Sequence, residues 1–318
     1  MQEIASPRKR AAGFAMIAQL SRNLVKTLLA VESLQVSIIS PGNLSMSEFS
    51  FLDAIHRSPI DVPLAALCFA REIAYPALDV QHYQYQLDDL CQSARVQLSP
   101  FLSTAEQAEA LSDFLFTQQR FRGNSATYQD PRNSYLNEVM ERRLGIPISL
   151  SVIYIAIAQD IGLPAYGVGL PGHFIVGIPE NGDEIYIDPF HGGVRLFQAD
   201  CVQLVREATG FSGAFQPEWL KPVSPTVILT RMLNNLRNIC LHQEDWTSSL
   251  AVVERLRMLQ PDLPDLLRDL GVIYERLGSL RLAIQCYEQY LAQAPQAADA
   301  GNVLARLRDA ARQLSRLN

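Results

Sequence analysis

A stretch between positions 145 and 188 has the residue types and the order that acyl-transfer chemistry uses. A helix start at residues 145–147 (GIP) is followed by a strand-like stretch that carries His173 and by a second one that carries Asp188. A thiol site uses this order, because the helix start stabilises a thiolate, the imidazole accepts its proton and the carboxylate orients the imidazole. No cysteine stands at this helix start. The sequence therefore predicts a base and an orienting acid without their usual nucleophile.

A hairpin signal separates the two strand-like stretches. They cover residues 173–178 and 184–188, and the residues between them read Pro-Glu-Asn-Gly-Asp. A hairpin centred near residues 180 and 181 places His173 directly opposite Asp188 on the same face, with Cβ atoms about 5 Å apart. The sequence thus predicts that the imidazole and the carboxylate are neighbours, and a slip of one register would separate them.

Ser149 and Ser151 are the hydroxyl-bearing residues nearest to the missing thiol. With His173 as base and Asp188 as orienting group, either of them would make the protein a hydrolase or acyltransferase. Two residues along a helix turn a side chain by about 200°, so Ser149 is expected to point away from the side of position 147. This geometry weighs against a serine replacement.

His191 adds a third potential metal ligand to His173 and Asp188. It lies in a predicted turn, and three candidate ligands without a fourth are a weak signal for a metal site. We therefore expect no metal and no cofactor, and we read His191 as a polar loop residue at the edge of the cleft.

Three polar residues before the helix start are further candidates for lining a cleft. They are Asn133, Arg142 and Arg143. Each has a structural alternative, because Asn133 or Ser134 could cap a helix and the two arginines suit a helix C-terminus.

Helices are the main elements that must position these residues. From Leu150 to Ala158 only Ser151 and the hydroxyl of Tyr154 are polar, so the helix from about 147 to 161 is expected at the centre of the domain. Amphipathic patterns predict further helices between residues 46 and 145. The expected fold class is therefore α+β, a mostly helical core with a small antiparallel sheet.

The residues after position 225 are repetitive. Leu236 and Leu270, like Pro261 and Pro295, lie 34 residues apart, which is the period of tetratricopeptide repeats. Gly271 and Tyr287 stand at further positions of this repeat pattern. Two such repeats rarely stand alone, so we expect them to pack on the first domain or on another copy. The predicted organisation is a tail at 1–45, a first domain at 46–210, a linker at 211–224 and the helical repeats at 225–318.

Composition limits the compartment and the partners. With 318 residues, 48% hydrophobic and 19% charged, the chain resembles an ordinary globular protein. The net charge of -6 argues against a general nucleic-acid binder. The five scattered cysteines form no CxxC pair, which predicts reduced thiols in a cytoplasmic protein. The apolar stretch after residues 8–10 (RKR) is too short to span a membrane.

These residues resemble a bacterial family, the SirB-type transglutaminase-like proteins with C-terminal tetratricopeptide repeats. The matching stretches are 133–136 (NSYL), 142–151 (RRLGIPISLS), 171–174 (PGHF) and 188–190 (DPF). With the repeats, the resemblance covers about residues 46–310. It implies a papain-related core followed by an all-α module. Active transglutaminase-like domains usually open the central helix with Gly-x-Cys, which implies that Pro147 occupies the cysteine position and that His173 and Asp188 match the family's His and Asp.

Three interpretations of the function remain. The protein is a pseudoenzyme that binds a protein or peptide through the cleft or the repeats, a serine enzyme, or a metal protein. We favour the first, because Pro147 has no heteroatom and is simply a good helix starter. The expected partner is a protein or peptide, with neither nucleic acid nor membrane involved, and a homo-oligomer is compatible with the repeats.

Overall fold

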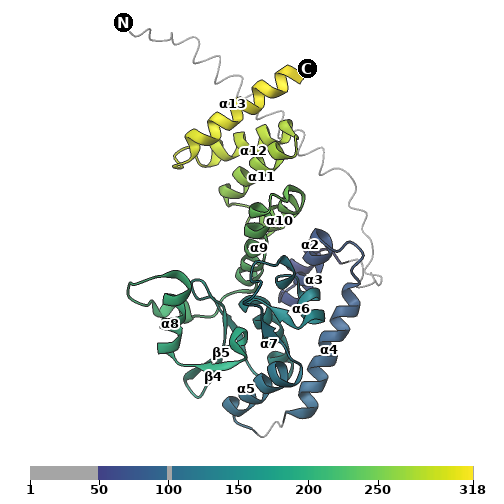
Figure 1. The fold of residues 1–318 in the computed structure, drawn as a ribbon, viewed down its shortest axis with the longest axis vertical. Coiled ribbons are helices and arrows are strands. Elements are labelled where there is room, and N and C mark those ends of the chain that lie inside the picture. The colour runs from purple at the N-terminus through teal and green to yellow at the C-terminus, as the bar shows by residue number, and fades with distance from the viewer. Residues whose placement is uncertain (1–48, 99–101, 318) are drawn as a thin grey trace. The chain divides into compact units, whose positions relative to one another are not determined.

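The computed structural model describes residues 49–98 and 102–317, and helices predominate in them (Figure 1). A mostly helical domain with a small antiparallel sheet is followed by a module of paired helices. The predicted α+β class is therefore confirmed. The tail predicted at residues 1–45 lies outside the described residues.

Helices of different lengths precede the central helix of the first domain. Asp61 and Asp79 start two of them by accepting amide hydrogen bonds from the first turn, and Ser103 forms the expected capping box with Glu106. The elements in chain order are α2 (Phe51–Ile55), α3 (Val62–Ile73), α4 (Val80–Gln97), α5 (Thr104–Ser112), the π-helical η2 (Asp113–Gln118), η3 (Pro131–Asn133) and α6 (Leu136–Arg142).

The cap predicted for α6 is wrong. Neither Asn133 nor Ser134 caps this helix, because Asp130 caps a separate turn of 3-10 helix at Pro131–Asn133 first. The N-cap of α6 is Tyr135, which provides no side-chain hydrogen bond.

Helix α7 (Pro147–Asp160) is buried along almost its whole length. Every side chain from Pro147 to Ala158 is buried except that of Ala156. The Tyr154 hydroxyl, inside the core, donates a hydrogen bond of 2.9 Å to the carbonyl of Ala108. Helices α3, α4, α6 and the sheet all contact α7, as expected for a helix that is apolar on every side.

The four-stranded sheet is an antiparallel meander in the order β3-β4-β5-β6. Its strands are β3 (Tyr166–Val168), β4 (Ile175–Glu180), β5 (Asp183–Asp188) and β6 (Val194–Leu196). A separate parallel pair joins β1 (Arg122–Gly123) to β2 (Leu144–Gly145).

The predicted hairpin register is wrong by one residue at the turn. Glu180 pairs with Asp183, so the turn residues are Asn181 and Gly182. Both have positive φ, at 53° and 94°, which is the conformation a type I′ turn requires and Asn-Gly prefers. His173 consequently lies before the start of β4 and not opposite Asp188. The shift moves the residue opposite Asp188 by two positions along the strand. Residues two apart on a strand point to the same face of the sheet, so His173 stays on the face of Asp188.

The C-terminal module consists of two helix pairs and a last helix. After α8 (Gln198–Thr209) and η5 (Pro217–Leu220) come α9 (Pro225–His242), α10 (Trp246–Leu259), α11 (Pro264–Arg276), α12 (Leu280–Gln293) and α13 (Ala300–Leu317). Gly271 on α11 leaves room for the ring of Tyr287 on α12, where a Cβ atom would collide with it. This contact explains why both residues belong to the repeat pattern.

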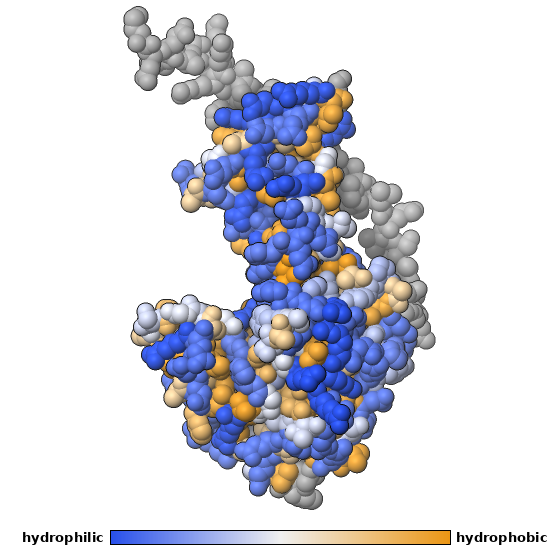
Figure 2. Space-filling view, viewed as in Figure 1, coloured by the Kyte–Doolittle hydropathy of each residue, from blue (hydrophilic) through white to orange (hydrophobic). Residues whose placement is uncertain are grey.

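The repeats pack on the first domain, as expected for so short an array. Ile228, Leu229 and Met232 of α9 are buried in the same core cluster as α3 and α7, and α10 contacts α2 and α3. The end of the predicted linker is attached to the sheet, because the Val223 amide donates to the carbonyl of Gly167. On the face seen in Figure 2, the surface of the repeat helices is mainly hydrophilic, with scattered hydrophobic residues.

Candidate active-site cleft

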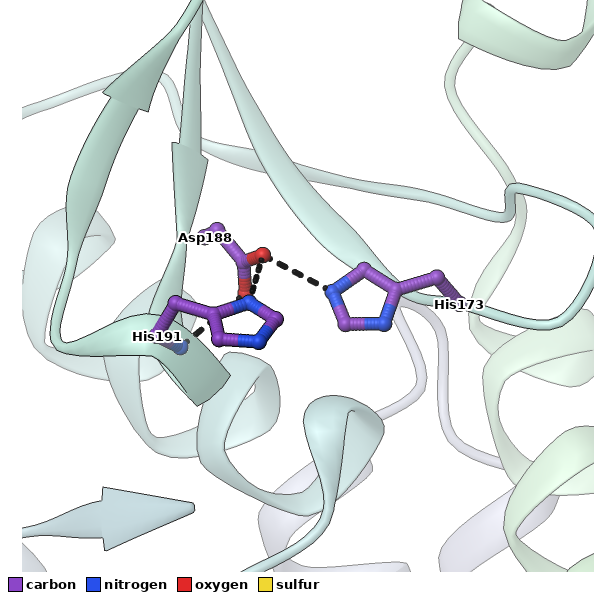
Figure 3. Close-up of side chains that lie close together, drawn as sticks. All are labelled: His173, Asp188 and His191. Atoms are coloured by element: carbon purple, nitrogen blue, oxygen red, sulfur yellow. Dashed lines mark hydrogen bonds and ion pairs between the residues drawn. The ribbon is translucent and has the colours of Figure 1, made fainter. Parts of the chain in front are cut away.

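His173, Asp188 and His191 meet at the end of the sheet (Figure 3). The Nε2 atom of His173 lies 2.9 Å from Oδ2 of Asp188, and Nδ1 of His191 lies 2.7 Å from the same oxygen. The two imidazole rings are stacked, with centroids 5.7 Å apart. The structure thus brings together the histidine and the aspartate that the sequence singled out as base and orienting acid, and it places His191, the third potential metal ligand, beside them.

Asp188 is fully buried and uses both carboxylate oxygens. Oδ2 faces the two imidazoles, while Oδ1 accepts from the amides of Phe190 and His191. Burial alone would raise the pKa of Asp188, but the hydrogen bonds and charges of His173 and His191 outweigh it and lower the pKa. The carboxylate is therefore an anion that is held in one orientation.

A cavity of about 120 Å³ opens beside the imidazole of His173. We refer to it as the His173 cavity, and its lining residues are Tyr128, Pro147, Ile148, Gly172, His173, Phe174, Arg231 and Asn235. Pro147 thus shares a cavity with the candidate base, as a nucleophile at that position would. None of these lining residues is a cysteine, serine or threonine.

Ser149 and Ser151 are placed differently from Pro147. Both are fully buried, and neither is among the residues that line the His173 cavity. The Ser149 hydroxyl donates a hydrogen bond of 2.7 Å to the carbonyl of Asn133 and accepts one from the amide of Ile146. Ser149 therefore joins the first turn of α7 to the preceding loop, and its role as a nucleophile stays a prediction that this geometry does not favour.

Replacing Ser149 by alanine is expected to lower the free energy of unfolding by about 1–3 kcal/mol, because the Ile146 amide and the Asn133 carbonyl lose a buried partner. Urea denaturation followed by circular dichroism measures this loss. The exposed Gln92→Ala on α4 is the control and should change the stability by less than about 0.5 kcal/mol. A Ser149→Ala variant with unchanged stability but lost hydrolytic activity would instead support the serine enzyme.

The other residues expected in the cleft lie elsewhere. Asn133 is fully buried and its amide group hydrogen-bonds to Asn124 and to the carbonyls of Thr127 and Tyr128. Arg142 forms an ion pair with Asp130 at 3.5 Å. Arg143 has a positive φ of 57° and its guanidinium lies over the ring of Phe121. These three side chains organise the segment before α7 and do not line the His173 cavity.

Arg231 and Asn235 are cavity residues that the sequence reasoning missed. Both belong to α9, and Arg231 donates to the backbone carbonyls of Leu170 and His173 at 3.0 and 2.7 Å. Its guanidinium also lies over the ring of Phe174. Burial lowers the pKa of Arg231. No local pattern marks these two residues, because they reach the cavity only through the packing of α9 on the first domain.

The native cysteines lie away from the His173 cavity. All five are buried, and none lines the His173 cavity. Burial raises the pKa of Cys68, Cys91 and Cys201 to about 12 and that of Cys240 to about 11. These thiols are protonated at neutral pH and have the character of structural cysteines.

Comparison with known proteins assigns both parts of the chain. Residues 81–234 match the transglutaminase-like superfamily, and residues 236–308 match the tetratricopeptide repeat. A UPF0162 protein of Xylella fastidiosa (strain Temecula1) is 35% identical over 232 residues, which are 71% of this chain and 81% of that protein. The chain belongs to the UPF0162 family. This is the SirB-type bacterial family that the sequence motifs resemble.

Other matches include a second member of this family and proteins outside it. A UPF0162 protein of Pseudomonas aeruginosa is 30% identical over 66% of this chain and 76% of its own length. Human F-box only protein 21 is 35% identical over 105 residues, which are 30% of this chain and 17% of that protein. A solved structure of menin covers 80% of this chain and 73% of its own, with 10% identity and a TM-score of 0.36, which is too low to carry any conclusion.

Among the described residues, no helix has the length and apolar character needed to cross a membrane.

Proposed function

We propose that this UPF0162 protein is a non-catalytic transglutaminase-like protein that binds a protein or peptide partner. The observation that carries the proposal is the lining of the His173 cavity. Pro147 stands where a nucleophile would face His173, and the lining residues offer neither a thiol nor an aliphatic hydroxyl. His173 and Asp188 then remain as a hydrogen-bonded pair without a group to activate.

The His173 cavity and the repeats belong to one candidate binding surface. Arg231 and Asn235 of α9 form part of the cavity wall, and the tetratricopeptide match begins on the same helix at residue 236. Tetratricopeptide repeats support a role in protein interaction. A partner segment bound along α9 would therefore lie beside the cavity.

The test is partner binding by the full-length protein and by a variant whose cavity is filled. A partner is first captured from a lysate and purified, and its affinity is then measured by titration calorimetry. Asn235→Trp is expected to weaken binding at least about tenfold, because the new side chain occupies the cavity and opposes desolvated contacts of the partner. Gln92→Trp, at an exposed position on α4, is the matched control and should bind as the unchanged protein does.

The alternative is a hydrolase or acyltransferase that uses Ser149 or Ser151 with His173 and Asp188. The intact imidazole–carboxylate pair at 2.9 Å favours it, and the buried, hydrogen-bonded state of Ser149 opposes it. A fluorophosphonate probe separates the two proposals. Labelling of Ser149 that disappears in His173→Ala would establish the enzyme. The non-catalytic binding protein proposed above should show no labelling and no hydrolysis of esters or amides.

A further inference from the structure

His191 has no role in a thiol or serine site, although it contacts the same carboxylate oxygen of Asp188 as His173 does. One histidine is enough to accept a proton, and Asp188 already orients His173 through Oδ2. His191 brings a second imidazole to that same oxygen, at 2.7 Å, and its side chain remains 54% exposed. This convergence of two imidazole nitrogens on one carboxylate oxygen calls for another explanation.

The turn that carries His191 is fixed by its own hydrogen bonds. Asp188 caps the short 3-10 helix Pro189–His191, and the amide of Gly193 returns to the carbonyl of Asp188 at 2.8 Å. Gly192 and Gly193 both have positive φ, at 80° and 73°, and a Cβ atom at Gly193 would collide with Phe116. The backbone therefore holds His191 beside Asp188 at positions that favour glycine.

We propose that His173, Asp188 and His191 form a binding site for one divalent transition-metal ion. The ligand atoms are Nε2 of His173, Oδ2 of Asp188 and Nδ1 of His191, and all three lie within 4.8 Å of one another. Two histidines and one carboxylate are a ligand set suited to ions such as Fe²⁺, Co²⁺ and Zn²⁺. The inference is independent of whether the cavity binds a peptide.

Two of the three distances between the ligand atoms fit one face of an octahedron, and the two ring nitrogens, which lie within 4.8 Å of each other, would have to approach to complete it. Ligand atoms about 3 Å apart occupy neighbouring corners around an ion whose bonds are about 2.1 Å long. The two distances from Asp188 Oδ2, 2.9 and 2.7 Å, have this value. Both rings would have to rotate to aim their lone pairs at a common point, because both nitrogens now face Oδ2 itself.

The surroundings of Asp188 support the role of Oδ2 as a ligand. Its other oxygen, Oδ1, is held by the amides of Phe190 and His191, as the outer hydrogen bonds of metal-binding carboxylates usually are. Both imidazoles would bind the ion as neutral rings, with the ring proton on the nitrogen that does not bind it, Nδ1 of His173 and Nε2 of His191. The exposed side of His191 leaves space for water or a partner's ligand at the remaining positions.

Metal binding is measured on the full-length protein after treatment with a chelator. The protein is dialysed against Co²⁺ or Zn²⁺ alone, bound metal is determined by elemental analysis, and the Co²⁺ complex is followed by its visible absorption. We expect one ion per chain. His191→Ala should weaken binding at least about tenfold, because it removes a ligand from a half-exposed position without opening the core.

His242→Ala is the matched control, because His242 is exposed on α9 and lies outside the cluster. It should bind Co²⁺ as tightly as the unchanged protein. Mg²⁺ should not compete, since it prefers oxygen ligands to imidazole. The proposal is overturned if no saturable site of one ion per chain is found, or if His191→Ala binds Co²⁺ with unchanged affinity.

Discussion

Replacing Asp188 by alanine is expected to lower the free energy of unfolding by about 3–5 kcal/mol at pH 7. Asp188 is fully buried and accepts hydrogen bonds from two imidazoles and two backbone amides. Removing the carboxylate leaves these donors without their acceptor inside the protein. Such a loss is a large fraction of the stability of an average domain, and urea denaturation measures it.

The contribution of Asp188 to the free energy of unfolding should decrease at low pH. Because folding lowers the pKa of this carboxyl, its stabilising contribution is fully present above the unfolded value of about 4 and is lost as the pH falls through the folded value. The difference in stability between the unchanged protein and Asp188→Asn should therefore shrink below about pH 4.

Asp183→Ala is the matched control for this prediction. Asp183 is an exposed acid at the other end of the same strand, so its replacement should change the stability by less than about 0.5 kcal/mol. If Asp188→Ala cost less than about 1 kcal/mol at pH 7, the hydrogen-bonded cluster around this carboxylate would not exist in solution.

The central helix and the repeats could be predicted from the sequence, because their apolar patterns are compatible with only one kind of packing. The apolar stretch of α7 has no polar face, so it fits only at the centre of the domain. The repeat positions of Gly271 and Tyr287 correspond to a real contact between two helices. Family motifs then supplied the papain-related arrangement, which composition and periodicity alone do not specify.

The hairpin register shows how a single turn decides the placement of a site. Asn181 and Gly182 adopt the positive φ angles of a type I′ turn, and this preference moves the turn by one residue. The contact between His173 and Asp188 survives, because the shift moves the partner by two positions and keeps the same face. It forms, however, from the loop before β4 and not from a directly opposed pair.

Contacts between distant segments could not be predicted in the same way. Arg231 meets the loop that carries His173 only because α9 packs on the first domain, more than fifty residues further along the chain. The side chain of Asn133 was expected in the cleft, but it forms hydrogen bonds with the side chain of Asn124 and the carbonyl of Thr127 instead. Such outcomes depend on tertiary packing, which a single sequence does not encode in any local pattern.

In the proposed function, Pro147 occupies the place of a nucleophile beside His173. Pro147→Cys should therefore create a reactive thiol. The amides at the start of α7, and the His173 imidazole once it has accepted the thiol proton, both stabilise a thiolate; they act against the rise in thiol pKa that burial of residue 147 causes and are expected to outweigh it. The loss of proline at N1 should be tolerated, because its ring is favourable but not essential there.

The most direct test is the pH dependence of alkylation at residue 147 by iodoacetamide, quantified by mass spectrometry of the native protein. Pro147→Cys should show a midpoint at least about one pH unit below the ordinary thiol value of about 8.5, and His173→Ala in the same background should raise it. Gln289→Cys, at an exposed position on α12, should titrate with the ordinary value, and the five buried native cysteines should react slowly. An ordinary midpoint at residue 147 that does not respond to His173→Ala would contradict the claim.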